Sequence, residues 1–98
     1  MREGEIVEII EKSLAEKMAK DINYIRYSYY EVNVKYTKTR EDRNMFMHLL
    51  KTKLESDNYK IYYEGQRFNY KGANILVQVN EELIAIKNEK EDTENGII

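Results

Sequence analysis

The sequence predicts an α+β fold, a two-layer sandwich in which two helices cover one face of a mainly antiparallel sheet. Apolar residues recur at helical spacing in two segments and alternate in the others, and short turns separate the alternating segments. The expected order of elements is α-β-α-β-β-β-β. The helix between the first two strands favours a right-handed crossover, which places both helices on the same face. A length of 98 residues suits one domain with a modest core.

Two segments have the apolar pattern of amphipathic helices. The first runs from Glu3 to Lys20, or two residues further, and acidic residues crowd its start, where the helix dipole favours them. Because it lacks a sustained heptad repeat, packing on a sheet is favoured over a coiled coil. The second runs from Arg40 to Ser56, with Thr39 as its N-cap and Asp42 three residues further on, a variant of the capping box.

The segment between the helices alternates like a long strand from Arg26 to Thr37. One face of this strand is expected to be buried, and it carries Tyr30, Val32, Val34 and Tyr36. The opposite face is expected to meet water, and it carries Tyr29, Glu31, Asn33 and Lys35.

Short strands are expected to follow the second helix. They run over Tyr59 to Glu64, Gln66 to Lys71, Ile75 to Val79 and Leu83 to Lys87. A tight turn at Gly65 would place the apolar residues of the first two strands on one face. The last strand has two possible registers: a two-residue turn before it buries Ile84 and Ile86, whereas a three-residue turn buries Leu83 and Ala85.

The domain is assigned to residues 1–88, and residues 89–98 are expected to form a disordered acidic tail. No apolar run approaches the roughly 20 residues that a membrane span needs. The N-terminus is acidic, unlike that of a signal peptide, and the chain has no cysteine, so we expect a cytoplasmic protein without disulfides. The net charge is −2, but residues 24–80 sum to +4 while both ends are acidic.

The outer face of the predicted sheet is the candidate binding surface. It combines tyrosines, amides and cations: Tyr29, Asn33, Lys35, Lys60, Tyr62, Arg67, Asn69 and Lys71. Aromatic rings of this kind stack on bases or anchor protein interfaces, and cations neutralise phosphate. The same composition is also typical of a merely solvated sheet face. Of the nine tyrosines, only Tyr29 and Tyr62 are assigned to this surface, and five others are expected to join the core.

No catalytic or metal-binding signature is present. The only histidine, His48, is predicted to face solvent on the second helix, and no carboxylates have the spacing of metal ligands. We therefore expect no cofactor. A metal-independent ribonuclease using Tyr62, Arg67 and Lys71 is a less favoured hypothesis.

The sequence favours a small non-enzymatic binding or regulatory protein that contacts a protein partner through this sheet face. Binding of RNA or single-stranded nucleic acid by the same face is the alternative. Steep weakening by salt would distinguish nucleic acid from a protein partner. A homodimer through an edge strand or through Leu76 is also open. The codon bias implied by abundant Glu, Ile, Lys, Asn and Tyr indicates an A/T-rich genome, cellular or viral.

Overall fold

A computed structural model describes residues 1–88 of the chain and confirms the α+β fold. The elements, in order, are α1 (Glu3–Lys20), β1 (Tyr24–Ser28), the π-helix η1 (Glu31–Tyr36), α2 (Arg40–Ser56), β2 (Tyr59–Tyr63), β3 (Arg67–Tyr70), β4 (Ala73–Leu76) and β5 (Glu81–Lys87). The predicted acidic tail lies outside the described residues. Neither long helix of residues 1–88 is apolar enough to cross a membrane.

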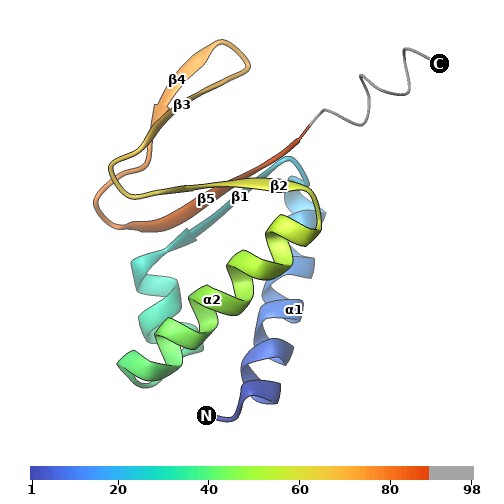
Figure 1. The fold of residues 1–98 in the computed structure, drawn as a ribbon, viewed down its shortest axis with the longest axis vertical. Coiled ribbons are helices and arrows are strands. Elements are labelled where there is room, and N and C mark those ends of the chain that lie inside the picture. Colours follow the sequence, from blue (N-terminus) through green and yellow to red (C-terminus); the bar gives the residue numbers. More distant parts are fainter. Residues whose placement is uncertain (89–98) are drawn as a thin grey trace, which may run out of the picture.

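The strands form two separate sheets. In the larger one, β5 lies between β1 and β2 and runs antiparallel to both, so that Ala85 pairs with Ile25 on one side and with Ile61 on the other. Strands β3 and β4 form a hairpin of their own. Figure 1 shows the helices on one side of the three-stranded sheet and the hairpin on the other.

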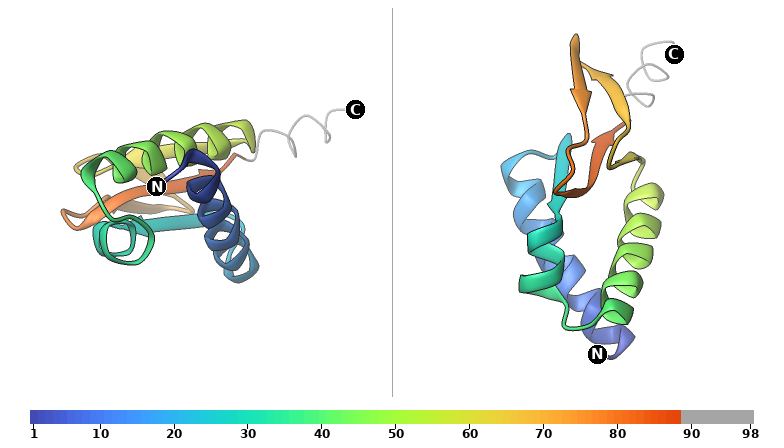
Figure 2. Two further views of the ribbon diagram at one scale, coloured as in Figure 1. Left: turned by 90° about the horizontal axis from the view of Figure 1, so that it is seen from below. Right: turned by 90° about the vertical axis from the view of Figure 1, so that its left-hand side faces the viewer.

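Helices α1 and α2 have the predicted bounds and the predicted cap. The Asp42 N–H donates to the hydroxyl of Thr39 at 3.1 Å, and the N–H of Arg2 donates to Glu5 at 2.8 Å. Both helices lie on the same side of the sheet (Figure 2), and their buried residues share one core with it. The fully covered core residues are Ile6, Ile10, Leu14, Ile25, Tyr27, Val32, Phe46, Leu50, Leu54, Tyr59, Leu83 and Ala85. The prediction of two helices on one face is confirmed.

The β3–β4 hairpin packs on the opposite sheet face, where the sequence predicts open surface. Phe68 and Val77 of the hairpin segment form a second buried cluster with Ile84 of β5. The chain does turn at Gly65, but the prediction that this turn places the apolar residues of β2 and β3 on one face is wrong. Those of β2 face the helices, and those of β3 face the second cluster. At Gly65, whose φ is +86°, the chain leaves the sheet, and β5 takes the place beside β2 that β3 was expected to occupy.

Strand β5 is buried on both faces. Leu83 and Ala85 contact the helices, while Ile84 faces the hairpin. Each of the two registers therefore predicts some of the buried residues: one predicts Ile84, and the other predicts Leu83 and Ala85. A central strand with cover on each side has no solvent face, so alternation could not choose between them.

The long strand predicted over Arg26 to Thr37 is wrong beyond Ser28. Tyr29 and Tyr30 begin a helical turn that continues as η1. The Glu31 N–H donates to the Ser28 hydroxyl at 3.1 Å, and the Ser28 N–H donates to the Glu31 carboxylate at 3.1 Å. This reciprocal pair is a capping box, and it starts a helix where alternation predicts a strand.

The helical conformation changes which side chains of this segment are buried. Val32 is buried, and the ring of Tyr36 stacks on Phe46 with centroids 5.5 Å apart. Tyr30 and Val34, which the strand prediction placed in the core, are 63% and 61% exposed. Apolar side chains therefore meet water at the surface of this short helix.

Candidate functional site

The predicted binding face is covered in the region of Tyr62. The ring of Tyr62 stacks on Phe68 of the hairpin, with centroids 4.1 Å apart and planes at 17°. Lys60 lies beside it, with its ammonium 5.7 Å from the Tyr62 ring centroid. The prediction of Tyr62 on an open platform is therefore wrong, because the hairpin folds over that face. The contacts of Tyr62 are those of a packing residue.

Three other predicted residues lie on the outer side of the hairpin. Arg67 pairs with Leu76 and Asn69 with Asn74, so their side chains point away from the buried Phe68. Asn69 accepts a hydrogen bond from the Gly72 N–H at 3.2 Å. Lys71 has a φ of +51° and belongs to the two-residue turn. These residues are exposed, but they line none of the hollows described below.

The structure does not bring together the groups of the hypothetical ribonuclease. Tyr62 lies under the hairpin, whereas Arg67 lies on its outer side and Lys71 in its turn. His48 is exposed on α2, as predicted. Within residues 1–88, no cluster of three or more histidine or acidic side chains is placed to hold a metal ion. Tyr62, Arg67 and Lys71 therefore do not share one site.

The remaining predicted residues, Tyr29, Asn33 and Lys35, lie on the helical segment 29–36 and not on the sheet. This segment runs beside the first turns of α2. Tyr29 and Asn33 line a hollow of about 210 Å³ between the two elements. We call it the arginine pocket, and its full lining is Tyr29, Asn33, Thr37, Lys38, Thr39, Arg40 and Arg43.

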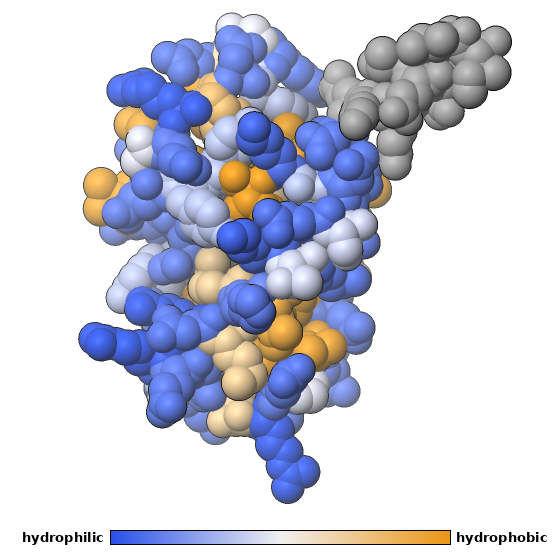
Figure 3. Space-filling view, viewed as in Figure 1, coloured by the Kyte–Doolittle hydropathy of each residue, from blue (hydrophilic) through white to orange (hydrophobic). Residues whose placement is uncertain are grey.

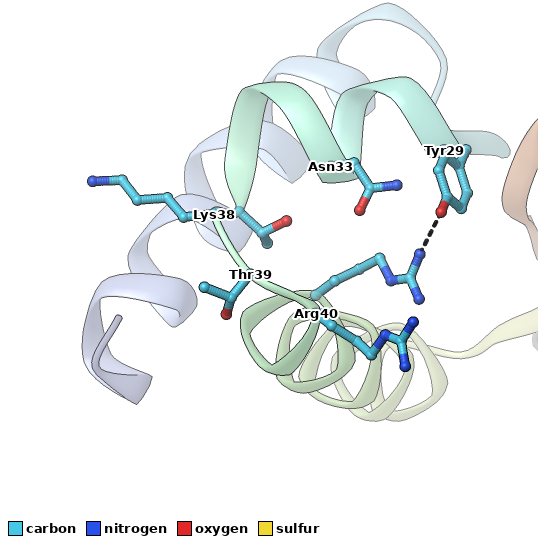
Figure 4. Close-up of a pocket in the computed structure, with 7 residues that line it drawn as sticks. Tyr29, Asn33, Lys38, Thr39 and Arg40 are labelled. Atoms are coloured by element: carbon cyan, nitrogen blue, oxygen red, sulfur yellow. Dashed lines mark hydrogen bonds between the residues drawn. The ribbon is translucent and has the colours of Figure 1, made fainter.

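Two guanidinium groups dominate the arginine pocket. Figure 4 shows Arg40 below Asn33 and Tyr29, while the ammonium of Lys38 points away, and Arg43 also lines the hollow. The lining contains no acidic residue. Among residues 1–88, neither Arg40 nor Arg43 forms an ion pair with a carboxylate within 4.0 Å. The charged residues of the pocket wall, Lys38, Arg40 and Arg43, are therefore all cationic.

Tyr29 positions one of the two guanidinium groups. Arg43 Nη1 donates to the Tyr29 hydroxyl at 2.9 Å, and the guanidinium carbon lies 5.2 Å from the ring centroid. Because the hydroxyl oxygen accepts this hydrogen bond, its own hydrogen stays free to donate. The ring is 49% exposed, so the contact forms part of the pocket's rim.

The amide of Asn33 has no partner on one side. Its Nδ2 atom is buried, and no hydrogen-bond acceptor lies within reach in the described structure. Figure 4 places this amide above the two arginine side chains. A buried donor without an acceptor is uncommon in folded proteins, so each case calls for an explanation.

An acidic hollow lies on the other side of the Tyr29 and Arg43 pair. It has a volume of about 360 Å³, and its lining includes Glu64, Glu81 and Glu82. Burial raises the pKa of Glu82, Arg43 opposes this effect, and the nearby Glu64 adds to it. The pair therefore divides a cationic pocket from an anionic one.

A third hollow, between α1 and α2, is mainly apolar. It has a volume of about 200 Å³ and is lined by Val7, Ile10, Leu49, Thr52, Lys53 and Ser56. Figure 3 shows apolar colour where the two helices meet, surrounded by hydrophilic residues. Its lining has one charged residue, Lys53, so it offers contact area but few groups to orient a ligand.

Sequence reasoning found two residues of the arginine pocket and missed its two arginines. Thr39 and Arg40 were considered only as a cap and a helix start. The signal that could have found the site is the pattern Ser28-Tyr-Tyr-Glu31, which predicts a helix beginning at residue 29. That helix would have placed Tyr29 and Asn33 on one face, four residues apart.

Comparisons with protein-family models, with curated proteins and with solved structures found no significant match to this chain. Its function is therefore inferred from the site itself.

Proposed function

We propose that this protein is a small non-enzymatic binding module that docks a cytoplasmic protein partner through the surface formed by the helical segment 29–36 and the start of α2. We call it the η1 surface, and it comprises Tyr29, Tyr30, Val34, Arg40 and Arg43. The proposal keeps the protein partner expected from the sequence and moves its docking surface from the sheet to this helix.

The observation that carries the proposal is the exposure of large apolar side chains beside unpaired arginines. Among residues 1–88, seven large hydrophobic side chains are exposed, and three of them, Tyr29, Tyr30 and Val34, fall within six consecutive residues. Tyrosine and arginine are enriched at interface hot spots: tyrosine buries a large ring with only two side-chain torsions, and arginine offers a planar group that stacks and makes paired hydrogen bonds. Exposed apolar side chains gathered in this way favour a protein contact.

The charge of this surface indicates the chemistry of the partner. Arg40 and Arg43 lack carboxylate partners within residues 1–88. Acidic groups of a partner could form ion pairs with both arginines while its apolar residues cover Tyr30 and Val34. Such complementarity adds association rate and specificity.

Nucleic acid is the less favoured ligand. Binding along a nucleic-acid backbone requires a stripe of several cations. Here the chain carries a net charge of −2, and the acidic hollow with Glu64, Glu81 and Glu82 begins directly beside Arg43. A single cationic pocket next to an acidic one suits one anionic group better than a polyanion.

Site-specific photo-crosslinking in the native host tests the proposal. A photoreactive phenylalanine at position 30 is expected to capture one protein, and the same group at the exposed Lys12 of α1 should not. The pair Arg40→Gln, Arg43→Gln should reduce the yield at position 30. Equal labelling from both positions, or no adduct at all, would refute the docking surface. An adduct destroyed by nuclease would instead support the nucleic-acid alternative, and one composed of this chain alone would support a homodimer.

A further inference from the structure

We infer that the arginine pocket is a binding site for a phosphate monoester group. Tyr29, Asn33, Arg40 and Arg43 are the residues that would hold it. The phosphate site is inferred from the pocket alone. The molecule that carries the phosphate is inferred from the proposed function, and it would be the partner protein, with the phosphate on one of its side chains.

The charge of the pocket matches a dianion. Arg40 and Arg43 both line the pocket, and no acidic residue is part of its wall. A phosphate monoester carries about −1.5 to −2 charges near neutral pH. Arginine presents its N–H groups in a planar fork that binds phosphate oxygens in pairs, so two arginines can hold a phosphate from two sides.

The remaining groups of the wall are polar and uncharged, apart from Lys38. The Asn33 Nδ2 atom is buried and unpaired, and the Tyr29 hydroxyl accepts from Arg43 while its hydrogen is free. The Thr39 hydroxyl accepts from the Asp42 N–H and also hydrogen-bonds the Asp42 carboxylate, so it is already used within the protein. An anion with several acceptor oxygens could accept from the arginine guanidinium groups and from the free hydrogen of the Tyr29 hydroxyl together.

A monoester fits the pocket better than a carboxylate or a phosphodiester. A carboxylate has two oxygens and one charge, which a single arginine can satisfy. A phosphodiester also has one charge, and chain continues from two of its oxygens. The terminal group of a monoester offers three oxygens, and a hollow of about 210 Å³ has room for it. Glu41 carries opposite charge in the same turn of α2, but it does not line the pocket.

The position of the pocket lets a protein-borne phosphate reach it. Its rim includes Tyr29, which is 49% exposed, and the neighbouring Tyr30 and Val34 are exposed further along the same helix. A partner segment lying across these apolar side chains would bring a phosphorylated residue over the two arginines. The apolar contacts would then hold the segment, and the pocket would read its phosphorylation.

Titration of the whole protein with inorganic phosphate tests the site. NMR of the arginine Nε–Hε and asparagine side-chain signals should show shifts confined to Arg40, Arg43 and Asn33, beyond those caused by sodium chloride at equal ionic strength. Arg40→Gln or Arg43→Gln should weaken binding about tenfold each, the usual effect of losing a charge-assisted hydrogen bond. Arg67→Gln removes one exposed arginine elsewhere and should change nothing.

Further ligands identify the class and the carrier of the group. Dimethyl phosphate should bind at least tenfold more weakly than inorganic phosphate, and equal binding would overturn the monoester assignment. A capped phosphoserine tripeptide should bind at least as well as inorganic phosphate, and its unphosphorylated form should not bind. If the tripeptide binds more weakly than free phosphate, a protein-borne group is excluded as the carrier.

The two proposals fail in different ways. Phosphate shifts that match those of sodium chloride, or that Arg67→Gln removes as fully as Arg40→Gln does, would overturn the phosphate site whether or not position 30 captures a partner. A site that binds phosphate while position 30 captures no protein would leave the pocket intact and refute the docking surface.

Discussion

The β3–β4 hairpin and the η1 surface both present tyrosines beside cations, but only the η1 surface forms a pocket. On the hairpin, the aromatic rings are used in packing: Tyr62 stacks on Phe68, and Tyr70 lies 5.5 Å from Tyr24. On the η1 surface, the ring of Tyr29 instead positions Arg43 at the edge of a hollow. The comparison shows that the same residue types pack together in one place and line a cationic hollow in another.

The two regions also differ in how their cations are arranged. Arg67 and Lys71 lie apart on the outer side and in the turn of the hairpin, where each is solvated alone. Arg40 and Arg43 are three residues apart on α2 and line one hollow together with Asn33. Convergence, and not the number of cations, is what distinguishes a binding site from a solvated face.

The largest expected effect tests whether the hairpin is structural. Phe68→Ala should lower the free energy of unfolding by about 3 kcal/mol, because it removes a buried ring and its stack with Tyr62. Tyr29→Ala should change it by less than about 1 kcal/mol. Urea unfolding followed by circular dichroism measures both, and Arg67→Ala controls for changes on the outer face. Equal costs at Phe68 and Tyr29 would break the comparison.

The next effect tests where the partner binds. The double change Arg40→Gln, Arg43→Gln should weaken partner binding about 100-fold, or roughly 2.8 kcal/mol if the two arginines contribute independently. The charge-matched change Arg67→Gln, Lys71→Gln on the hairpin should leave it within about twofold. Affinity for the crosslinked partner is the measurement. A larger loss from the hairpin pair would return the binding surface to the face that the sequence predicts.

A smaller effect concerns the anchor of η1. Glu31 is partly buried, which alone would raise its pKa, but the hydrogen bonds from Lys17 and from the Ser28 N–H lower the pKa below its ordinary value of 4.5. A carboxyl group with a lowered pKa in the folded state stabilises the fold above its unfolded pKa, and this contribution is lost as pH falls through the folded value.

Glu31→Gln should therefore lower the melting temperature at pH 7, and the gap to the natural protein should close as pH falls below about 4.5. Amide exchange should speed up in residues 29–36 and stay unchanged in the hairpin. Glu8→Gln, at an exposed position of α1, is the control. A gap that persists at low pH would show that the carboxylate does not anchor this helix.

The smallest effect concerns the hairpin turn. Lys71 and Gly72 have φ values of +51° and +86°, the signature of a turn that prefers Asn-Gly. Lys71→Asn should raise the free energy of unfolding by about 0.5 kcal/mol, because asparagine tolerates this conformation better than lysine. Partner binding should not change. Weaker binding without a change in stability would give Lys71 a role in recognition.

Much of the fold could be predicted from the sequence. The bounds of α1 and α2 and the Thr39 cap follow from local spacing and local hydrogen bonds, and the structure confirms them. The site was predicted only in part. Tyr29 and Asn33 belong to it, but the alternating pattern predicts a strand for both. Residues four apart, such as Val32 and Tyr36, share a face in a strand and in a helix alike, so their spacing cannot distinguish the two conformations. The Ser28 and Glu31 capping box decided the conformation.

The sequence by itself determined the local elements, whereas the tertiary structure decided which surfaces they share. The placement of β5 between β1 and β2 depends on contacts between distant segments, and several apolar strands could have filled that position. The same contacts turned the hairpin over the predicted binding face and partly buried Tyr62. The arginine pocket needed both levels, since the helix begins through a local cap, but Arg40 and Arg43 meet Tyr29 and Asn33 only when α2 packs beside it.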